Sequence, residues 1–380
     1  MPPGFGLRRR SLRSRRFGSR TGARPADCGG GRSRSESGDF AALVTALHDA
    51  GARKPAPFGS WSHARPSGLE ACVKKVFDIL GLGCAAVDDL VYVESYPPAD
   101  AKVSVLRSER QCGGLTATAL VAASRLGSRC AFAGVLGTDE LSEYGIRRMR
   151  EEGIDLTCLR QRPDARIIHS FIVVDVARNT RNIFADLNGV VGADPDWPEP
   201  EVILNSRVLQ IDDFGLAGLI RAVGIARKDG IPVVADFERV RGPGFPQLLE
   251  MVDHLIVSQQ FAEKVTGSRD PAESIQRLWS ENRKVVAVTC GTNGCWFTEA
   301  GGSKSLQHQP AFAVKTVDTT GCGDVFHGAY ASALARDLEL KERMIFASAT
   351  AALKATRPGG QAGIPDRKQV EAFLKAREIA

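Results

Sequence analysis

Residues 317–324 read VDTTGCGD, and an apolar, helical stretch, VFHGAYASALA, follows at 325–335. Glycines directly before a helix leave backbone N–H groups free, and the helix dipole adds positive potential at the same place, so this stretch predicts an anion site suited to phosphate. Asp324 stands in the first turn of the helix, beside the expected anion. Phosphoryl transfer needs such a site and a carboxylate that accepts the proton of the attacking hydroxyl. The alternative is a capped helix whose N-terminal acid has no further role.

Short β-branched runs alternate with helical patterns along the rest of the chain. The pattern predicts strands at 75–80, 130–135, 207–211, 232–236, 254–257 and 284–289, and helices at 115–125, 139–152, 216–228 and 271–281. Strands that alternate with helices indicate a mainly parallel sheet with helices on both faces. Residues 90–110 and 167–187 interrupt this alternation and predict antiparallel strands that form a small β-sheet lid over a cleft.

Composition and charge exclude several classes of protein. The 380 residues are 43% hydrophobic and 25% charged, as in soluble globular proteins, and no apolar run approaches the ~18 residues of a membrane-spanning helix. The net charge is +6, but residues 1–60 alone carry +8, so residues 61–380 carry −2. A slightly acidic body indicates no nucleic-acid partner for the folded domain.

The N-terminal 72 residues differ from the domain predicted for 73–380. Residues 1–38 are rich in Arg, Ser and Gly and have almost no apolar pattern, which predicts disorder, and residues 39–50 are compatible with one short helix. Three interpretations stay open: an organelle transit peptide, a basic arm that touches anionic surfaces, and an extension without a role. The nine cysteines form no C-x-x-C pair and no zinc spacing, which indicates free thiols in a reducing compartment. We therefore expect a cytoplasmic protein, or a protein imported into an organelle if the extension is a transit peptide.

The stretch DTTGCGD resembles the D-T-x-G-A-G-D signature of the ribokinase-like (PfkB) carbohydrate kinases, and the resemblance covers about residues 74–375. It implies a ribokinase-like α/β fold with a β lid, the use of ATP and Mg²⁺, and phosphorylation of a sugar hydroxymethyl group. It assigns the general base to Asp324 and the anion hole to Gly321, Cys322 and Gly323. Cys322 replaces the usual Ala; its amide does the work, so we expect activity together with sensitivity to oxidants.

Two further stretches resemble the family's sugar site. Residues 83–88 (GCAAVD) resemble its first strand, which ends in an Asp that binds sugar hydroxyls, and this role falls on Asp88. A carboxylate that accepts two neighbouring hydroxyls suits a polyol; the alternative is an Asp that only caps its turn. Gly113 and Gly114 match the G-G-x-x-x-N element, with Leu115 and Thr118 where the family often has Asn. Altered sugar recognition is therefore expected.

Residues 286–294 (VAVTCGTNG) resemble the family's strand and turn beneath the ATP phosphates, and assign nucleotide contacts to Thr289, Gly291 and Gly294. The family's N-x-x-E element falls at 258–261, where Ser258 stands first and the Glu is absent. Since that Glu helps to organise Mg²⁺, other groups are expected to do so, with Glu263 as a substitute.

Asp318 and Thr320, with the loop 357–363, match a monovalent-cation (K⁺) site of some relatives. Residues 307–312, 324–329 and 356–366 look most like the sulfofructose kinase branch, and Lys102 sits where that branch contacts the anionic end of its substrate. Ala185 and Asp213 stand where Asn and Arg would complete a sulfonate pocket, which favours an uncharged or differently substituted sugar. A homodimer formed through the lid is a further implication.

Two rival interpretations remain. Residues 81–86 (GLGCAA) fit the dinucleotide fingerprint G-x-G-x-x-A, but a helix must follow it, whereas 90–93 alternate like a strand. The other rival is a non-catalytic kinase fold that serves as a binding or assembly module. The intact Gly-x-Gly-Asp turn argues against this rival, and the missing Glu argues for it.

Overall fold

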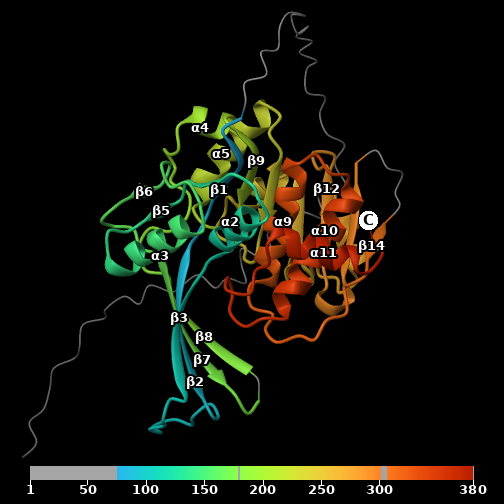
Figure 1. Cartoon of the computed structure of the whole chain (residues 1–380). Helices are drawn as coiled ribbons and strands as arrows, with labels where there is room; N and C mark the ends of the chain where they lie inside the picture. Colours follow the sequence, from blue (N-terminus) through green and yellow to red (C-terminus); the bar gives the residue numbers. More distant parts are fainter. Residues whose placement is uncertain (1–74, 179, 301–305, 380) are drawn as a thin grey trace, which may run out of the picture. The chain divides into compact units, whose positions relative to one another are not determined.

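The computed structural model describes residues 75–178, 180–300 and 306–379. The extension predicted for 1–72, with its transit-peptide alternative, lies outside the described residues. Within them, the central sheet has the strand order β14-β13-β12-β11-β10-β9-β1-β4 (Figure 1). Its strands are β1 (Phe77–Leu82), β4 (Cys130–Phe132), β9 (Ser206–Ile211), β10 (Val233–Asp236), β11 (His254–Ser258), β12 (Val285–Thr289), β13 (Cys295–Glu299) and β14 (Gln307–Gln309). Only the pairings of β12 with β13 and of β13 with β14 are antiparallel, so the prediction of a mainly parallel sheet is confirmed.

Helices cover both faces of this sheet because its strands are apolar on both sides. In β1, Ile79 joins one core cluster, whereas Leu80 and Leu82 join the other. The first cluster packs under α2 (Leu115–Arg125), α3 (Glu140–Glu151), α9 (Cys322–Ala335), α10 (Leu340–Ala355) and α11 (Arg367–Lys375). The second packs under α4 (Pro200–Leu204), α5 (Leu216–Lys228), α6 (Phe245–Met251), α7 (Gln259–Thr266) and α8 (Pro271–Leu278).

A separate sheet with the order β3-β2-β7-β8 projects from the body, as Figure 1 shows. Its strands are β2 (Ala86–Val93), β3 (Arg107–Gly113), β7 (Ile168–Asp175) and β8 (Thr180–Asp186). The expectation of purely antiparallel pairing is wrong, because β2 and β7 leave the body in the same direction and pair in parallel. The predicted first lid segment, 90–110, also begins earlier, at Ala86, and residues 94–106 form a connection rather than a strand.

The predicted strand 130–135 is two strands. Residues 130–132 join the central sheet as β4, whereas β5 (Val135–Leu136) pairs with β6 (Arg160–Gln161) in a sheet of its own. Within the described residues no helix is long and apolar enough to cross a membrane. The seven cysteines described there are all free thiols, as predicted.

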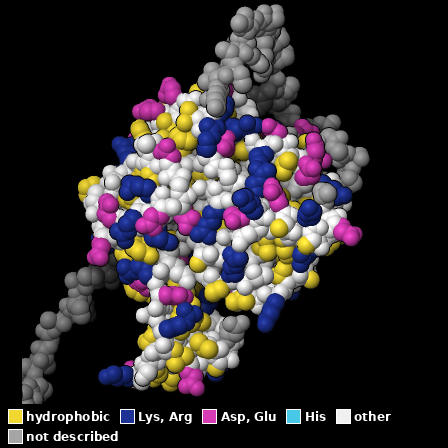
Figure 2. Space-filling view, in the orientation of Figure 1, with side chains coloured by type: hydrophobic (Ala, Val, Ile, Leu, Met, Phe, Trp, Pro, Cys, Tyr) yellow, Lys and Arg dark blue, Asp and Glu magenta, His cyan; other side chains and the backbone are white. Residues whose placement is uncertain are grey.

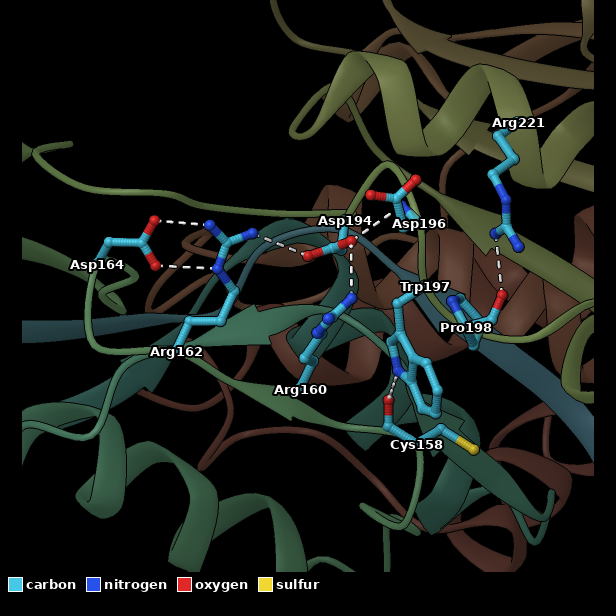
Figure 3. Close-up of polar contacts among 9 residues, drawn as sticks. All are labelled: Cys158, Arg160, Arg162, Asp164, Asp194, Asp196, Trp197, Pro198 and Arg221. Carbon is cyan, nitrogen blue, oxygen red and sulfur yellow. Dashed lines mark hydrogen bonds and ion pairs between the residues drawn. The ribbon is translucent and has the colours of Figure 1, made fainter.

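The segment that returns from the lid is fixed to the body by the buried carboxylate of Asp194 (Figure 3). Asp194 accepts hydrogen bonds from Arg160 at 3.2 Å and from Arg162 at 3.0 Å. Beside it, the indole of Trp197 donates to the Cys158 carbonyl at 2.6 Å. The neighbouring Ala193 amide donates to the Phe214 carbonyl at 3.1 Å, so this segment lies against the loop between β9 and α5.

Candidate active site

The predicted anion-binding turn lies at the start of α9. Gly321 is its N-cap, with φ of 74°, a left-handed conformation that favours glycine, and a Cβ there would lie 3.2 Å from the Gly360 carbonyl. The Cys322 amide donates to the Thr319 carbonyl at 3.2 Å, so it is not free to bind an anion. The amides of Gly321 and Gly323 meet no protein acceptor in the part of the chain that the structure describes. Two of the three predicted amides are therefore available.

Asp324 lies in the first turn of α9 and is partly buried. Burial and the negative charges of Asp236, Glu238 and Asp212 raise its pKa well above the ordinary value, while Lys354 opposes this shift. A carboxylate with a raised pKa binds a proton more strongly and is better matched to act as a general base near neutral pH. The position and the charge environment of Asp324 suit the predicted role.

His327 fixes this first turn against the sheet. Its Nδ1 lies 2.8 Å from the Gly323 carbonyl oxygen and 3.1 Å from Asp236 Oδ2, and its Nε2 lies 2.9 Å from the Ile256 carbonyl oxygen. Burial lowers the pKa of His327, so the neutral ring carries one N–H and donates to one of these two carbonyl oxygens, which ties α9 to the sheet. His327 therefore positions the backbone of Gly323, and with it the neighbouring carboxylate of Asp324.

Asp88 lies within β2, opposite Gln111 of β3, and is half-buried. The prediction that residues 83–88 end a strand is wrong, since β1 ends at Leu82 and β2 begins at Ala86, and the turn-capping alternative for Asp88 is wrong for the same reason. A Cβ on Gly113 would lie 2.6 Å from Asp88 Oδ2, so this glycine leaves the space that the carboxylate occupies. Burial raises the pKa of Asp88.

The neighbouring Asp89 points to other partners. Arg110 donates to it through Nε at 2.6 Å and through Nη2 at 2.8 Å, and His169 Nε2 lies 2.8 Å from its Oδ2. These contacts lower the pKa of Asp89. Asp89 therefore holds the strands of the lid together.

Short contacts bring the two halves of the predicted site together. The Gly360 amide donates to Gln111 Oε1 at 3.0 Å, and Gly360 also lies against Gly321. Gln361 Nε2 donates to Thr118 Oγ1 at 3.1 Å, so Thr118, at the expected Asn position, holds the 357–363 loop. The turn at 321–324 and the strand that carries Asp88 therefore meet across this loop, although more than 200 residues separate them in the sequence.

Gly114 places α2 at the same junction. It is the N-cap of α2, with φ of 92°, and a Cβ would lie 2.6 Å from the Ala85 Cα. A residue with a side chain would be strained there and would collide with the backbone. Gly113 thus leaves room for the Asp88 carboxylate, and Gly114 lets α2 begin close to the backbone of Ala85.

Asp212 is a functional candidate that the sequence analysis missed. It is fully buried at the end of β9 and accepts from the Cys84 amide at 2.7 Å, the Thr116 hydroxyl at 2.8 Å and the Phe214 amide at 2.8 Å. Burial raises its pKa to about 6. A Cβ on Gly83 would lie 2.2 Å from Asp212 Oδ2, so this glycine serves Asp212. The dinucleotide interpretation of residues 81–86 is wrong, because the strand β2 rather than a helix follows Gly83.

A pocket of about 380 Å³ opens on the other side of the turn. The predicted nucleotide residues Thr289, Gly291 and Gly294 line it together with Cys322 and Gly323 from the start of α9. Its volume is in the range of small-molecule sites. The fourth predicted nucleotide residue, Ser258, pairs with Thr289 across β11 and β12, and its hydroxyl caps α7 by accepting from the Phe261 amide at 3.1 Å.

Two predicted residues are not brought into the site. Lys102 is exposed in the 94–106 connection beyond Val93, and five residues of strand separate Asp88 from Val93, about 16 Å. Glu263, the proposed substitute for the missing Glu, is paired with exposed Arg269 at 2.7 Å.

The expected oxidant sensitivity of Cys322 also lacks support. Burial raises the pKa of its thiol to about 11, and the thiol donates to the Ala351 carbonyl at 3.6 Å. Since the thiolate is the reactive form, a thiol with this pKa is largely unreactive at neutral pH.

Asp318 and Thr320, the predicted cation residues, form a closed turn. The Asp318 carboxylate accepts from the Thr320 amide at 2.8 Å and from the Gly359 amide at 2.9 Å. Despite partial burial, these bonds and the positive charge of Lys354 lower the pKa of Asp318. Asp318 therefore stays ionised and holds the 357–363 loop beside the anion-binding turn.

Comparison with known proteins places this geometry in a family. The chain is 25% identical to a ribokinase of Haemophilus influenzae over 303 residues, 77% of this chain and 97% of that protein. It is 28% identical to the probable fructokinase-2 of Arabidopsis thaliana, over 74% of this chain and 92% of that protein. The structure of a putative ribokinase from Agrobacterium tumefaciens superposes with a TM-score of 0.73 at 28% identity, over 80% of this chain and 99% of that one.

The family model described as pfkB family carbohydrate kinase matches residues 82–367. This match spans most of the chain and includes both the strand that carries Asp88 and the turn that carries Asp324. The ribokinase-like fold inferred from the signature is thereby confirmed. The chain belongs to the pfkB family of carbohydrate kinases.

Proposed function

We propose that this carbohydrate kinase transfers the γ-phosphoryl group of ATP to a primary hydroxyl of a sugar, with Asp324 as the general base. The observation that supports this proposal is the half-buried Asp324, with its raised pKa, beside two amides that meet no protein acceptor. Asp324 would take the proton of the sugar hydroxyl. The amides of Gly321 and Gly323 would stabilise the negative charge on the phosphoryl group during transfer.

The pocket that Thr289, Gly291 and Gly294 line is the proposed ATP site. Cys322 and Gly323 also line this pocket, so the phosphates of a nucleotide bound there would lie near the anion-binding turn. Among the described residues no cluster of three or more His, Cys, Asp or Glu side chains is placed to hold a metal ion. Mg²⁺ on a nucleotide needs only one or two carboxylates, because phosphates and water supply the other ligands. Asp236 and Glu238 fit this need: Asp236 Oδ2 is buried with only His327 Nδ1 near it, at 3.1 Å, and the charges of both acids act on Asp324. The bound ion would neutralise phosphate charge.

The substrate we propose is a neutral pentose or hexose whose hydroxyls donate to Asp88. Among the related proteins are a ribokinase and a probable fructokinase. The structure gives no support to the sulfofructose branch. The carboxylate of Asp213 is buried and paired with Arg241, and the predicted cation at Lys102 lies in the lid connection away from Asp88. An acceptor such as Asp88 favours hydroxyl donors over a sulfonate.

A screen of ketoses, aldoses, nucleosides and sulfosugars for ADP release tests this function. Asp88→Asn should raise the KM for the accepted sugar much more than the KM for ATP, whereas Asp89→Asn, the matched control in the same strand, should mainly lower stability. Equal effects on both substrates would contradict the role of Asp88. No ADP release with any of the acceptors would favour the alternative, a non-catalytic kinase-fold module.

The lid is the surface that we propose for a homodimer. Phe171, Ile183 and Phe184 of β7 and β8 are each about half exposed (50%, 53% and 52%), and Figure 2 shows hydrophobic side chains gathered over this part of the molecule. Exposed apolar groups of this size on one small sheet are typical of an interaction surface. Light scattering should give twice the chain mass for the wild type and the chain mass for Phe184→Glu. A monomeric wild type would refute the dimer.

We propose that the protein resides in the cytoplasm, with organelle import as the alternative if residues 1–72 are a transit peptide. The support for the alternative is their excess of Arg and Ser. A fluorescent protein fused behind residues 1–72 decides between the two: diffuse signal supports the first, and organelle signal supports the second.

A further inference from the structure

A lysine is buried directly behind the anion-binding turn. Lys354 lies in the last turn of α10 and has no exposed surface. Its Nζ donates to the Asp318 carbonyl at 3.0 Å. The next residue, Ala355, accepts the amides of Val317 and Asp318 at 2.8 and 3.1 Å. The end of α10 is therefore hydrogen-bonded to the segment that leads into the turn, through the amides of Val317 and Asp318 and through the Asp318 carbonyl.

The charges around the ammonium group are mostly negative. Asp318, Asp324 and Cys322 favour its charged form, although burial as a whole lowers the pKa of Lys354. Arg181 acts weakly in the opposite direction. An ammonium in an apolar interior is costly unless charges and hydrogen bonds compensate it. The sequence thus places a fixed positive charge within the electrostatic range of the proposed base.

The residues predicted to hold K⁺ do not fit a free cation. The two carboxylate oxygens of Asp318 accept the amides of Thr320 and Gly359, and its carbonyl accepts the ammonium of Lys354. A cation bound to the same groups would lie close to the ammonium and would be repelled by it. The oxygens of Asp318 are therefore already occupied, and the ammonium makes the potential beside them unfavourable for K⁺.

From this disagreement we propose that the ammonium group of Lys354 takes the place of a monovalent cation behind the anion-binding turn. Lys354 is then a positioning residue. It orders the segment 317–321 and supplies one permanent positive charge, so that the kinase needs no K⁺. This inference rests on the proposed function for its effect on catalysis. The occupation of the cation position rests on the contacts of Lys354 alone.

The test uses the full chain, the variant Lys354→Ala, and Lys341→Ala as the matched control, since Lys341 is exposed in the first turn of the same helix. Thermal unfolding and turnover are compared in KCl, NH₄Cl and tetramethylammonium chloride at equal ionic strength. The wild type and the control should show the same midpoint and the same kcat in all three salts. Lys354→Ala should lose about 10²-fold in kcat in tetramethylammonium. K⁺ or NH₄⁺ should raise its midpoint and restore part of the loss, because the cavity then binds the cation.

Three results would overturn the proposal: a wild-type midpoint or kcat that rises with K⁺, a Lys354→Ala protein with wild-type kcat in tetramethylammonium, and a folded Lys354→Ala protein that neither cation stabilises. If this variant fails to fold, the wild type decides by its response to K⁺. A wild type without turnover on any sugar would count against the proposed function. The unfolding measurement needs no sugar and would still decide the inference about Lys354.

Discussion

Replacing Asp324 by Asn separates a catalytic role from a structural one, because the structure predicts opposite effects on stability and on activity. The Asp324 carboxylate is partly buried beside Asp236, Glu238 and Asp212, which raise its pKa well above 3.8. An acid whose folded-state pKa lies above its unfolded value favours folding most below the unfolded pKa. It loses that stability as the pH rises through the folded pKa. At pH 7 to 8 its charge therefore opposes folding.

Asn removes this charge with almost no change in shape. A raised pKa means that the charged form opposes folding, so we expect Asp324→Asn to increase the free energy of unfolding at pH 7 to 8. The same change removes the proton acceptor. General-base catalysis contributes about 10²- to 10⁴-fold to a rate, and we expect kcat to fall by that factor while ATP binding is retained.

The two quantities are measured on one preparation: unfolding by denaturant at pH 7.5, and ADP release with the sugar that the screen identifies. Asp318→Asn is the control, because the pKa of Asp318 is lowered and its carboxylate accepts two amides. It should lose stability. An Asp324→Asn protein that turns over at the wild-type rate would refute the general base, and one that is less stable than the wild type would refute the charge argument.

Three further perturbations test the electrostatics and the packing. Glu238→Gln removes a charge that raises the pKa of Asp324, so the acid limb of the pH–rate profile should move to lower pH; an unmoved limb would contradict the coupling. Gly328→Ala would place a Cβ 2.0 Å from the Ala119 carbonyl oxygen, so the free energy of unfolding, measured with denaturant, should fall by about 1–3 kcal/mol. An unchanged value would contradict the tight packing of α2 against α9. The pKa of Asp212 is near 6 in the folded chain and 3.8 ordinarily, so the free energy of unfolding should fall by up to about 3 kcal/mol as the pH rises from 4 to 6. Asp212→Asn should flatten this slope, and an unchanged slope would contradict the prediction.

The parts of the fold that were predicted correctly are those with local signals. The helices at 115–125 and 216–228 match α2 and α5 because an apolar face ends at a basic last turn in each. The direction of β7 relative to β2 has no local signal, since both strands alternate in the same way whichever neighbour they join. The parallel pairing depends on where the chain leaves the body, and the sequence pattern does not contain this information.

The candidate site divides along the same line. The turn at 318–324 was found because glycines, an acid and a helix stand next to one another in the sequence. Asp212 was missed because its three hydrogen bonds come from residues 84, 116 and 214, which meet only in the folded chain. Lys354 was missed because a lysine in the last turn of a helix is typical of an exposed C-terminus. A signal existed, since the apolar residues around it predict a buried face.

The charges of three acids at this site act on the stability of the fold in the same direction. The pKa values of Asp236, Glu238 and Asp324 are all raised, so each of them opposes folding at neutral pH, and the two apolar clusters on either side of the central sheet offset this cost. Neutralising any one of the three should therefore stabilise the fold. Asp324 lies beside the two amides without acceptors, so its neutralisation should abolish turnover at every Mg²⁺ concentration, whereas a loss on neutralising Asp236 or Glu238, the proposed Mg²⁺ ligands, should be relieved by more Mg²⁺. A gain in stability that the three variants share, with a loss that Mg²⁺ does not relieve in Asp324→Asn alone, is the result that a purely structural acid cluster would not give.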